Sequence, residues 1–359
     1  MLKVCIIGSG MITNAAHIPA YKEFPEEFEI TGVCDINEAS AKDTAERHGI
    51  AHYYKTPEEM LEAEKPDIVS VCGPNFLHKE HTVLALKSGA HVLCEKPLAF
   101  TKHDAEEMFE LAKSKGKLLI ACQGFRFLPE RLAAKKYIDE HDMGDVYYGE
   151  LSRTRRRGIP TWGTFHIKEK SCGGAFLDIG VHMLDSLVWF MGNVKIKSVL
   201  AHSAQMHKYE TGTLTSSGAR AGVVNNPRKF DPEEMDVEDF SCGMLTFENG
   251  ARISFKIAWS ANVAESSDIV LSGKNYGFSL ESGKILSGCD TEAPLVQEPV
   301  KYEGAFPGHT YITENLIKVL KGEEELIIKP EETINVSTII ELFYKSADLG
   351  REAFADELD

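Results

Sequence analysis

The first 120 residues alternate short apolar runs with stretches of helical periodicity, and this alternation restricts the fold more than any other feature of the chain. The apolar runs lie at residues 3–7, 28–34, 68–72, 91–94 and 118–122, and the helical stretches lie at 38–48, 57–64, 78–88 and 102–115. Strands that alternate with helices in this way form a parallel sheet with helices on both faces. The sequence therefore predicts a doubly wound α/β domain over residues 1–122.

Residues 123–359 show a different pattern and predict a second domain of the α+β class. Glu248-Asn249-Gly250 joins two apolar runs and is typical of a β-hairpin. We expect a large, open and mainly antiparallel sheet with strands near 146–155, 194–205, 238–247, 251–259, 267–271 and 276–281. Helices are predicted over 174–191, ended by Gly192, and near 310–320 and 330–353, the last of which can pack back on the first domain. Residues 210–236, rich in Gly, Ser, Asn and Pro, are the best candidate for a long functional loop.

The composition limits the partners and the compartment. The chain has 39 lysines and arginines against 55 aspartates and glutamates, and its formal net charge of -16 would repel the phosphates of nucleic acid. It has no run of about 18 apolar residues and no signal-like segment after Met1-Leu2-Lys3, so we expect no membrane partner. Its eight cysteines are scattered without a C-x-x-C pair, which favours reduced core thiols over disulfides or a zinc site. The sequence therefore predicts a cytoplasmic protein.

A glycine turn follows the first predicted strand. In Gly8-Ser9-Gly10-Met11-Ile12-Thr13, Gly8 allows a tight turn and Gly10 lets the backbone approach a pyrophosphate. The helix that starts here offers free N–H groups and a favourable dipole to that anion. Thr13 stands where a third glycine is usual, and we expect it to weaken the packing of the helix on the strand without affecting the phosphate contact. The sequence therefore predicts a Rossmann dinucleotide-binding domain.

Asp35 ends the second predicted strand, 27 residues after Gly8. A carboxylate at this place can accept hydrogen bonds from the adenosine ribose, and it would repel the 2′-phosphate of NADP. We therefore predict NAD as the preferred cofactor. In the alternative interpretation, Asp35-Ile36-Asn37 is only a turn and a helix cap.

Two further groups of polar residues indicate catalysis. Glu95-Lys96 follows the fourth predicted strand, at the edge where doubly wound sheets bind ligands. Asp178, His182 and Asp185 are spaced i, i+4 and i+7 on one face of an otherwise apolar helix. Burying them without partners costs several kcal/mol, so they must face each other, a ligand or a polar cleft. By themselves they fit a satisfied core network or half of a metal site, but no other metal ligands stand at suitable spacing, and we expect no metal.

Together these residues resemble the glucose-fructose oxidoreductase and inositol dehydrogenase (Gfo/Idh/MocA) family. The matching motifs are the glycine turn, Gly73-Pro74-Asn75 with His78, the run from Gly89 to Pro97 and the run from Gly173 to Asp185. The likeness covers most of the chain. It implies an NAD(P)-dependent oxidoreductase that transfers hydride between nicotinamide and a secondary alcohol of a sugar, an inositol-like cyclic polyol or a sugar derivative. It also implies a cis peptide before Pro97 and a homodimer or homotetramer formed through the C-terminal sheet.

The resemblance also implies roles for single residues. Lys96 would contact the nicotinamide ribose and the reacting hydroxyl, Asp178 would bind the substrate, and His182 would exchange a proton with the hydroxyl. Histidine suits this role because its ordinary pKa is about 6.5. The predicted cofactor contacts are Gly8, Ser9, Gly10, Met11, Ile12, Asp35, Ile36, Gly73, Pro74, Asn75, His78, Glu95, Lys96 and Gln123. The predicted substrate contacts, besides the three catalytic residues, are Arg126, Arg156 and Trp162.

The sequence leaves the substrate and two other functions open. Trp162 can stack on a sugar-like ring or pack at the domain junction, and the arginines at 155–157 can bind hydroxyls or a carboxylate. An NAD-dependent glycosidase that oxidises and re-reduces its substrate would keep the same residues. A non-catalytic NAD-binding regulatory protein is the third candidate, although it would have no use for an acid–base pair.

Overall fold

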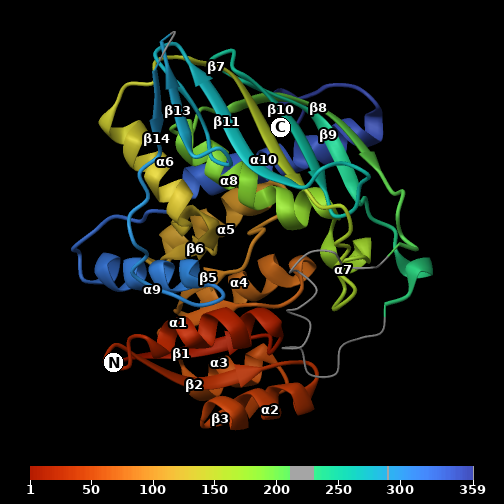
Figure 1. The fold of residues 1–359 in the computed structure, drawn as a ribbon. Coiled ribbons are helices and arrows are strands. Elements are labelled where there is room, and N and C mark those ends of the chain that lie inside the picture. The colour runs from red at the N-terminus through yellow and green to blue at the C-terminus, as the bar shows by residue number, and fades with distance from the viewer. Residues whose placement is uncertain (211–229, 289–290, 359) are drawn as a thin grey trace.

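The computed structural model describes residues 1–210, 230–288 and 291–358. The chain forms two sheets with their own helices, and Figure 1 shows the first sheet at the bottom of the view and the second at the top. The N-terminal part of the chain builds the first sheet, and the strands after β6 build the second. The two sheets therefore follow one another along the chain in the order expected from the sequence.

The first sheet has six parallel strands in the order β3-β2-β1-β4-β5-β6. The strand order reverses between β1 and β4, and such a reversal opens a ligand crevice at the carboxyl ends of the strands. The strands are β1 (Leu2–Ile7), β2 (Phe28–Cys34), β3 (His52–Tyr54), β4 (Ile68–Val71), β5 (His91–Cys94) and β6 (Leu119–Ala121). The helices are η1 (Thr13–His17), α1 (Ile18–Lys22), α2 (Glu38–His48), α3 (Pro57–Glu64), η2 (Asn75–Leu77), α4 (His78–Ser88) and α5 (Lys102–Ser114). The predicted Rossmann sheet is confirmed.

The second sheet has nine strands in the order β14-β13-β12-β11-β7-β10-β9-β8-β15. The neighbouring strands β7 and β10 are parallel, and the other pairs of neighbouring strands in this sheet are antiparallel. The strands are β7 (Val146–Thr154), β8 (Ile196–Ala204), β9 (Phe240–Phe247), β10 (Arg252–Ala258), β11 (Ser266–Gly273), β12 (Gly277–Ser279), β13 (Lys284–Ser287), β14 (Thr291–Pro294) and β15 (Ala353–Phe354). The predicted open, mainly antiparallel sheet is confirmed, as is the hairpin between β9 and β10, where Gly250 has φ 85°.

The helices of the second part include several that were not expected, and the expected helix over 174–191 is not one continuous α-helix. The helix expected over 174–191 consists of a π-helical turn, η4, followed by α8. The helix α6 was not predicted, because its buried positions Arg131, Ala133 and Ala134 give little hydrophobic periodicity. The helices are η3 (Gly124–Phe127), α6 (Pro129–Glu140), α7 (Lys168–Ser171), η4 (Phe176–Gly180), α8 (Val181–Phe190), η6 (Pro232–Glu234), α9 (Pro307–Leu320), α10 (Pro330–Leu349) and η7 (Ala355–Glu357). Most of the loop expected at 210–236 lies outside the described residues.

An aromatic layer holds the helix of the candidate site against the second sheet. Phe176 of η4 stacks on Phe343 of α10, with 3.6 Å between the ring centroids. Both rings also contact Phe255 of β10. Aromatic side chains bury large apolar areas, so this layer determines where η4 and α8 lie on the sheet.

The C-terminal helices return to the first domain (Figure 1). Glu341 of α10 accepts a hydrogen bond of 2.8 Å from the backbone N–H of Lys102, at the start of α5. Ile312 and Leu316 of α9 share an apolar cluster with Ile18 of α1. These contacts hold the carboxyl edge of the first sheet next to the helix of the second domain.

Five cysteines of the first domain are buried and free, as expected for core thiols: Cys5, Cys34, Cys72, Cys94 and Cys122. Across the described ranges, no helix combines the length and the apolar character needed to cross a bilayer.

Candidate active site

The glycine turn lies at the carboxyl end of β1. Gly8 has φ 96°, and a Cβ at this position would lie 2.8 Å from the carbonyl oxygen of Cys72, so the turn requires glycine. A Cβ on Gly10, in contrast, would have no heavy atom within 4 Å. The outer side of the turn is therefore open, which fits a backbone that a pyrophosphate can approach.

Thr13, the departure from the glycine pattern, is fully buried. Its hydroxyl donates a hydrogen bond of 2.6 Å to the carbonyl oxygen of Gly8. The prediction that Thr13 weakens this junction is therefore wrong, because its hydroxyl finds a backbone acceptor inside the turn and fastens the helix to it.

Asp35 faces the glycine turn from the end of β2. Its Oδ2 accepts hydrogen bonds from the backbone N–H and the hydroxyl of Ser9, at 2.8 and 2.9 Å, and its Oδ1 accepts one from the N–H of Asn37. A carboxylate has about four acceptor positions, so capacity for a ribose hydroxyl remains. The neighbouring Ile36 is 89% exposed. The turn role and the ribose role of Asp35 are therefore compatible.

Two predicted cofactor residues use their side chains to connect segments of the protein. His78 is buried, and its ring nitrogens lie 2.7 Å from the carbonyl oxygen of Pro97 and 3.0 Å from that of Gly73. Asn75 donates a hydrogen bond of 2.7 Å to the carbonyl oxygen of Ser171, at the end of α7. These contacts tie the loop after β4 to the turn after β5 and to the second domain.

Glu95 and Gln123 follow the neighbouring strands β5 and β6. The Glu95 carboxylate is already engaged, because its Oε1 accepts hydrogen bonds from His17 and His309. Gln123 is 2% exposed, and its Oε1 is buried with no hydrogen-bond partner in the described part of the chain. Burying a hydrogen-bond acceptor without a partner costs free energy. This oxygen can therefore accept a hydrogen bond from a ligand, such as the amide N–H of a nicotinamide.

Lys96 and Asp178 form the centre of the candidate site. Lys96 precedes Pro97 in a cis peptide, as the resemblance implies. Its Nζ lies 3.2 Å from Oδ1 and 3.0 Å from the carbonyl oxygen of Asp178. The fully buried Trp259, just after β10, donates its indole N–H to Oδ2 at 2.9 Å. The lysine and aspartate side chains are 17% and 16% exposed, so a small molecule can reach a pair whose carboxylate is held by the tryptophan.

Two glycines just before η4 allow the segment that carries Asp178 to pack closely against Tyr344 and Glu238. A Cβ on Gly173 would lie 1.9 Å from the hydroxyl of Tyr344, and one on Gly174 would lie 2.0 Å from the carbonyl oxygen of Glu238. The Glu238 carboxylate accepts hydrogen bonds from the N–H groups of Gly174 and Phe176 and from the Tyr344 hydroxyl. Glu238 thus satisfies free N–H groups at the helix start and fixes the segment that carries Asp178 and His182.

His182 lies in the first turn of α8. Its ring stacks on Phe125, with 4.0 Å between centroids and 14° between planes. Its Nδ1 is buried with no partner among the described residues, so Nε2 is the nitrogen that a ligand can reach. Its pKa is held well below the usual value by burial and then by three neighbouring positive charges, Lys96, Arg153 and Arg131. His182 is therefore a neutral imidazole at neutral pH and can accept a proton.

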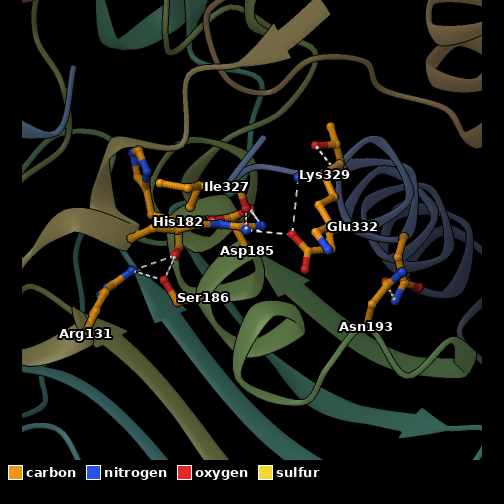
Figure 2. A network of polar contacts seen from close by, with 11 residues as sticks. Arg131, His182, Asp185, Ser186, Asn193, Ile327, Lys329 and Glu332 are labelled. Atoms are coloured by element: carbon orange, nitrogen blue, oxygen red, sulfur yellow. Dashed lines mark hydrogen bonds and ion pairs between the residues drawn. The ribbon is translucent and has the colours of Figure 1, made fainter. Parts of the chain in front are cut away.

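Arg126, a predicted substrate contact, lies in the core instead. Its side chain is fully buried, and its Nε and Nη2 donate to both carboxylate oxygens of Asp185, at 2.7 and 2.6 Å. Its Nη1 donates to Glu332 at 2.6 Å and to the carbonyl oxygen of Ile327 at 3.1 Å. Figure 2 shows this network together with the contacts of Arg131 to Ser186 and to the carbonyl oxygen of His182. The predicted substrate contact of Arg126 is therefore wrong, because two buried carboxylates hold its guanidinium.

The sequence places Asp178, His182 and Asp185 on one helix face, but Asp178 lies in the π turn η4, whereas His182 and Asp185 both lie in α8. A π turn holds about one residue more than an α-helical turn, so Asp178 is rotated relative to the other two. The Asp185 carboxylate is occupied by Arg126.

The two other predicted substrate residues lie in the segment after β7. The side chain of Arg156 is exposed. Trp162 is half-buried, contacts the ring of Phe165 edge-on, and has a buried indole N–H without a hydrogen-bond partner in the described chain. Trp162 therefore retains a donor for a ligand, whereas nothing in the structure links Arg156 to Lys96.

Three residues of the site were not predicted, namely Phe125, Glu238 and Trp259. Each acts on a residue that is distant in the sequence, so no local pattern indicates its role. The available signals were the segment Gly124-Phe125-Arg126-Phe127 just after a predicted strand, and a tryptophan at the end of another predicted strand.

Comparison with known proteins agrees with this arrangement. Residues 2–122 match the family model "Oxidoreductase family, NAD-binding Rossmann fold", and residues 132–278 match the "GFO/IDH/MocA C-terminal domain". The chain is 33% identical to a D-glucoside 3-dehydrogenase of Escherichia coli (strain K12) over 97% of this chain and 96% of the relative. It is 28% identical to a scyllo-inositol 2-dehydrogenase (NADP(+)) of Bacillus subtilis (strain 168), over 71% of this chain and 80% of the relative.

Solved structures show the same fold. The WlbA dehydrogenase from Bordetella pertussis, in complex with NADH and UDP-GlcNAcA, superimposes with a TM-score of 0.75 at 21% identity, covering 98% of both chains. The two family models and the relative of 33% identity agree with the glycine turn and the Lys96 turn. The protein belongs to the Gfo/Idh/MocA family of oxidoreductases, and its first domain is an NAD-binding Rossmann fold.

Proposed function

We propose that the protein is an NAD-dependent dehydrogenase that oxidises a secondary alcohol of a sugar, a cyclic polyol or a sugar derivative. The observation that carries this proposal is the contact of Lys96 with Asp178 beside a neutral His182. The residues fit the cofactor, since the glycine turn is open at Gly10 and Gln123 offers an unpaired acceptor. Residues 1–122 would hold NAD, and residues 123–359 would complete the substrate site.

The proposed mechanism uses the chemistry of three side chains. When bound, NAD accepts the hydride from the carbon that carries the hydroxyl. Nε2 of neutral His182 takes the hydroxyl proton, and the Lys96 ammonium stabilises the negative charge that develops on that oxygen. Asp178, held by Trp259, keeps the ammonium in place and offers an acceptor to a second hydroxyl.

The direct test is a panel of glucosides, free sugars, inositols and sugar acids, followed by absorbance of NADH. Glucosides come first because the 33% identical relative is a D-glucoside 3-dehydrogenase. NADH formed in proportion to oxidised product supports a dehydrogenase. Cleavage of an aryl glycoside without net NADH would instead indicate the transient-redox glycosidase, and tight NAD binding without any turnover would indicate a regulatory protein.

Asp35→Asn is expected to raise the use of NADP relative to NAD by about tenfold. The variant keeps an acceptor for Ser9 but removes the negative charge that would repel a 2′-phosphate, and about 1.4 kcal/mol corresponds to a factor of ten. The ratio of kcat/KM for the two cofactors measures the effect. Asp43→Asn on the exposed side of α2 is the matched control. An unchanged ratio in Asp35→Asn would show that Asp35 serves only the turn.

The pH profile of alcohol oxidation is expected to show an acidic limb below pH 6.5. The base must be neutral, and because the pKa of His182 is lowered in the folded protein, its protonation and the loss of activity begin only at lower pH. Arg153→Gln removes one of the charges that lower this pKa and should move the limb of kcat/KM toward neutral pH. Arg252→Gln, on the surface of β10, should leave it unchanged. A wild-type limb above pH 6.5 would contradict the assignment.

We also propose that the second sheet mediates a homodimer or homotetramer. Large apolar side chains are exposed on its strands, namely Tyr147 at 64%, Leu200 at 48% and Leu286 at 47%. Apolar groups exposed on a sheet are typical of surfaces that pack against another chain. The free buried cysteines support a reducing compartment such as the cytoplasm.

A further inference from the structure

Four side chains with metal-ligating atoms meet where α9 packs against the first domain. They are His17 at the end of η1, Glu95 after β5, Cys122 after β6 and His309 in the first turn of α9. One ligand atom from each lies within 4.8 Å of those of the other three. The four residues are between 1% and 8% exposed. We call them the four-ligand cluster.

Glu95 connects the two histidines of the cluster. Its Oε1 accepts hydrogen bonds from His17 Nε2 at 3.0 Å and from His309 Nε2 at 2.7 Å. Among the described residues, the ion-pair partners of Glu95 are these two histidines, and no lysine or arginine pairs with it. A buried carboxylate needs a positive partner, and a metal ion bound by the same two imidazoles would supply one.

The ligand types match one metal in particular. Two imidazoles, one thiol and one carboxylate form the mixed set that zinc binds in tetrahedral geometry, with bonds of about 2.0 to 2.3 Å. Such bonds place neighbouring ligand atoms roughly 3.3 to 3.7 Å apart. The Glu95–His17 and Glu95–His309 distances of 3.0 and 2.7 Å are therefore within a side-chain adjustment of this geometry.

The surroundings of His17 resemble the outer shell of a metal site. Its Nδ1 lies 3.0 Å from the hydroxyl of Ser70, which in turn lies 2.8 Å from the hydroxyl of Tyr21. A histidine that binds a metal through one nitrogen needs such a partner at the other nitrogen, because that bond sets the ring orientation and the tautomer. Nε2 is the nitrogen left for the metal.

We propose that the four-ligand cluster binds one zinc ion, which links α9 to the carboxyl ends of β5 and β6. In binding, zinc displaces the thiol proton of Cys122 to solvent, and the imidazoles coordinate through Nε2. The charges of Zn²⁺, one thiolate and one carboxylate then sum to zero inside a buried site. This proposal replaces the expectation of no metal, which the sequence favoured because positions 17, 95, 122 and 309 are far apart in the chain.

Metal analysis of the protein as purified, with any affinity tag removed, tests the proposal. We expect a zinc content near one ion per chain by mass spectrometry. After removal by a chelator, added Co²⁺ should give the visible bands of a tetrahedral site and a near-ultraviolet thiolate-to-cobalt band. Adding one equivalent of zinc to the chelated protein should raise its Tm.

Two variants identify the ligands. Cys122→Ser should lose the thiolate-to-cobalt band, and His309→Gln should lower the zinc content several-fold after the same dialysis. Cys34→Ser, which alters a buried cysteine outside the cluster, should keep both signals. Wild-type protein that contains less than about a tenth of an ion per chain and takes up neither Zn²⁺ nor Co²⁺ would overturn the proposal and leave the cluster as a hydrogen-bonded network. This result would not affect the proposed dehydrogenase, whose turnover is measured separately.

Discussion

Lys96→Ala and His182→Ala are each expected to lower kcat by about 100- to 10,000-fold while NAD binding remains measurable. Lys96 carries the charge that stabilises the developing alkoxide, and His182 provides the nitrogen that takes the proton. A general base contributes about 100- to 10,000-fold, and a positioned charge or donor contributes about 100- to 1,000-fold. Neither side chain is needed to hold the glycine turn, so the loss should appear in turnover.

Steady-state rates and NAD titrations followed by fluorescence measure the two effects separately. Lys42→Ala and His141→Ala, both at the surface, are matched controls and should behave as wild type. Rates like those of the wild type in either Lys96→Ala or His182→Ala would end the assignment of that residue. Circular dichroism confirms that each variant is folded before its rate is interpreted.

Arg126→Met is expected to lower the free energy of unfolding by about 3 to 5 kcal/mol. The arginine is fully buried between Asp185 of α8 and Glu332 of α10, so its loss leaves two buried carboxylates without a cation. A broken buried ion pair costs more than the pair itself contributes, because the remaining charge has no solvation. The effect should therefore be far larger than that of a surface pair.

Denaturant unfolding followed by circular dichroism measures this loss. Arg351→Met, which breaks the exposed pair with Glu357, is the control and should cost about 1 kcal/mol or less. The triple variant Arg126→Met, Asp185→Leu, Glu332→Met should recover much of the loss, since an apolar core of similar volume has no charge to bury. A cost of Arg126→Met no larger than that of the control would show that the network is solvated.

Much of the fold follows from local patterns. Five of the six strands of the parallel sheet, all except β3, and the β9–β10 hairpin agree with the runs expected from the sequence, because strands and turns are encoded by neighbouring residues. The helix α6 was not predicted because its buried positions, an arginine and two alanines, give only a weak apolar pattern. Its position became evident only from its packing.

In the candidate site, too, some residues are recognisable from the sequence and others are placed only by tertiary contacts. Lys96, Asp178 and His182 stand out in the sequence because polar residues interrupt apolar segments, and the structure places Lys96 against Asp178. Arg126 has the same kind of signal but lies in the core, since its partners Asp185 and Glu332 come from distant helices.

The sequence by itself determined the Rossmann topology, the family and the glycine turn, because each depends on the spacing of residues along one segment. The tertiary structure alone decided that Thr13 fastens the turn, that Asp185 pairs with Arg126, and that Trp259 holds Asp178. It also brought together His17, Glu95, Cys122 and His309, which no sequence spacing relates. Such contacts depend on how helices and sheets pack, and that packing is set by the whole core.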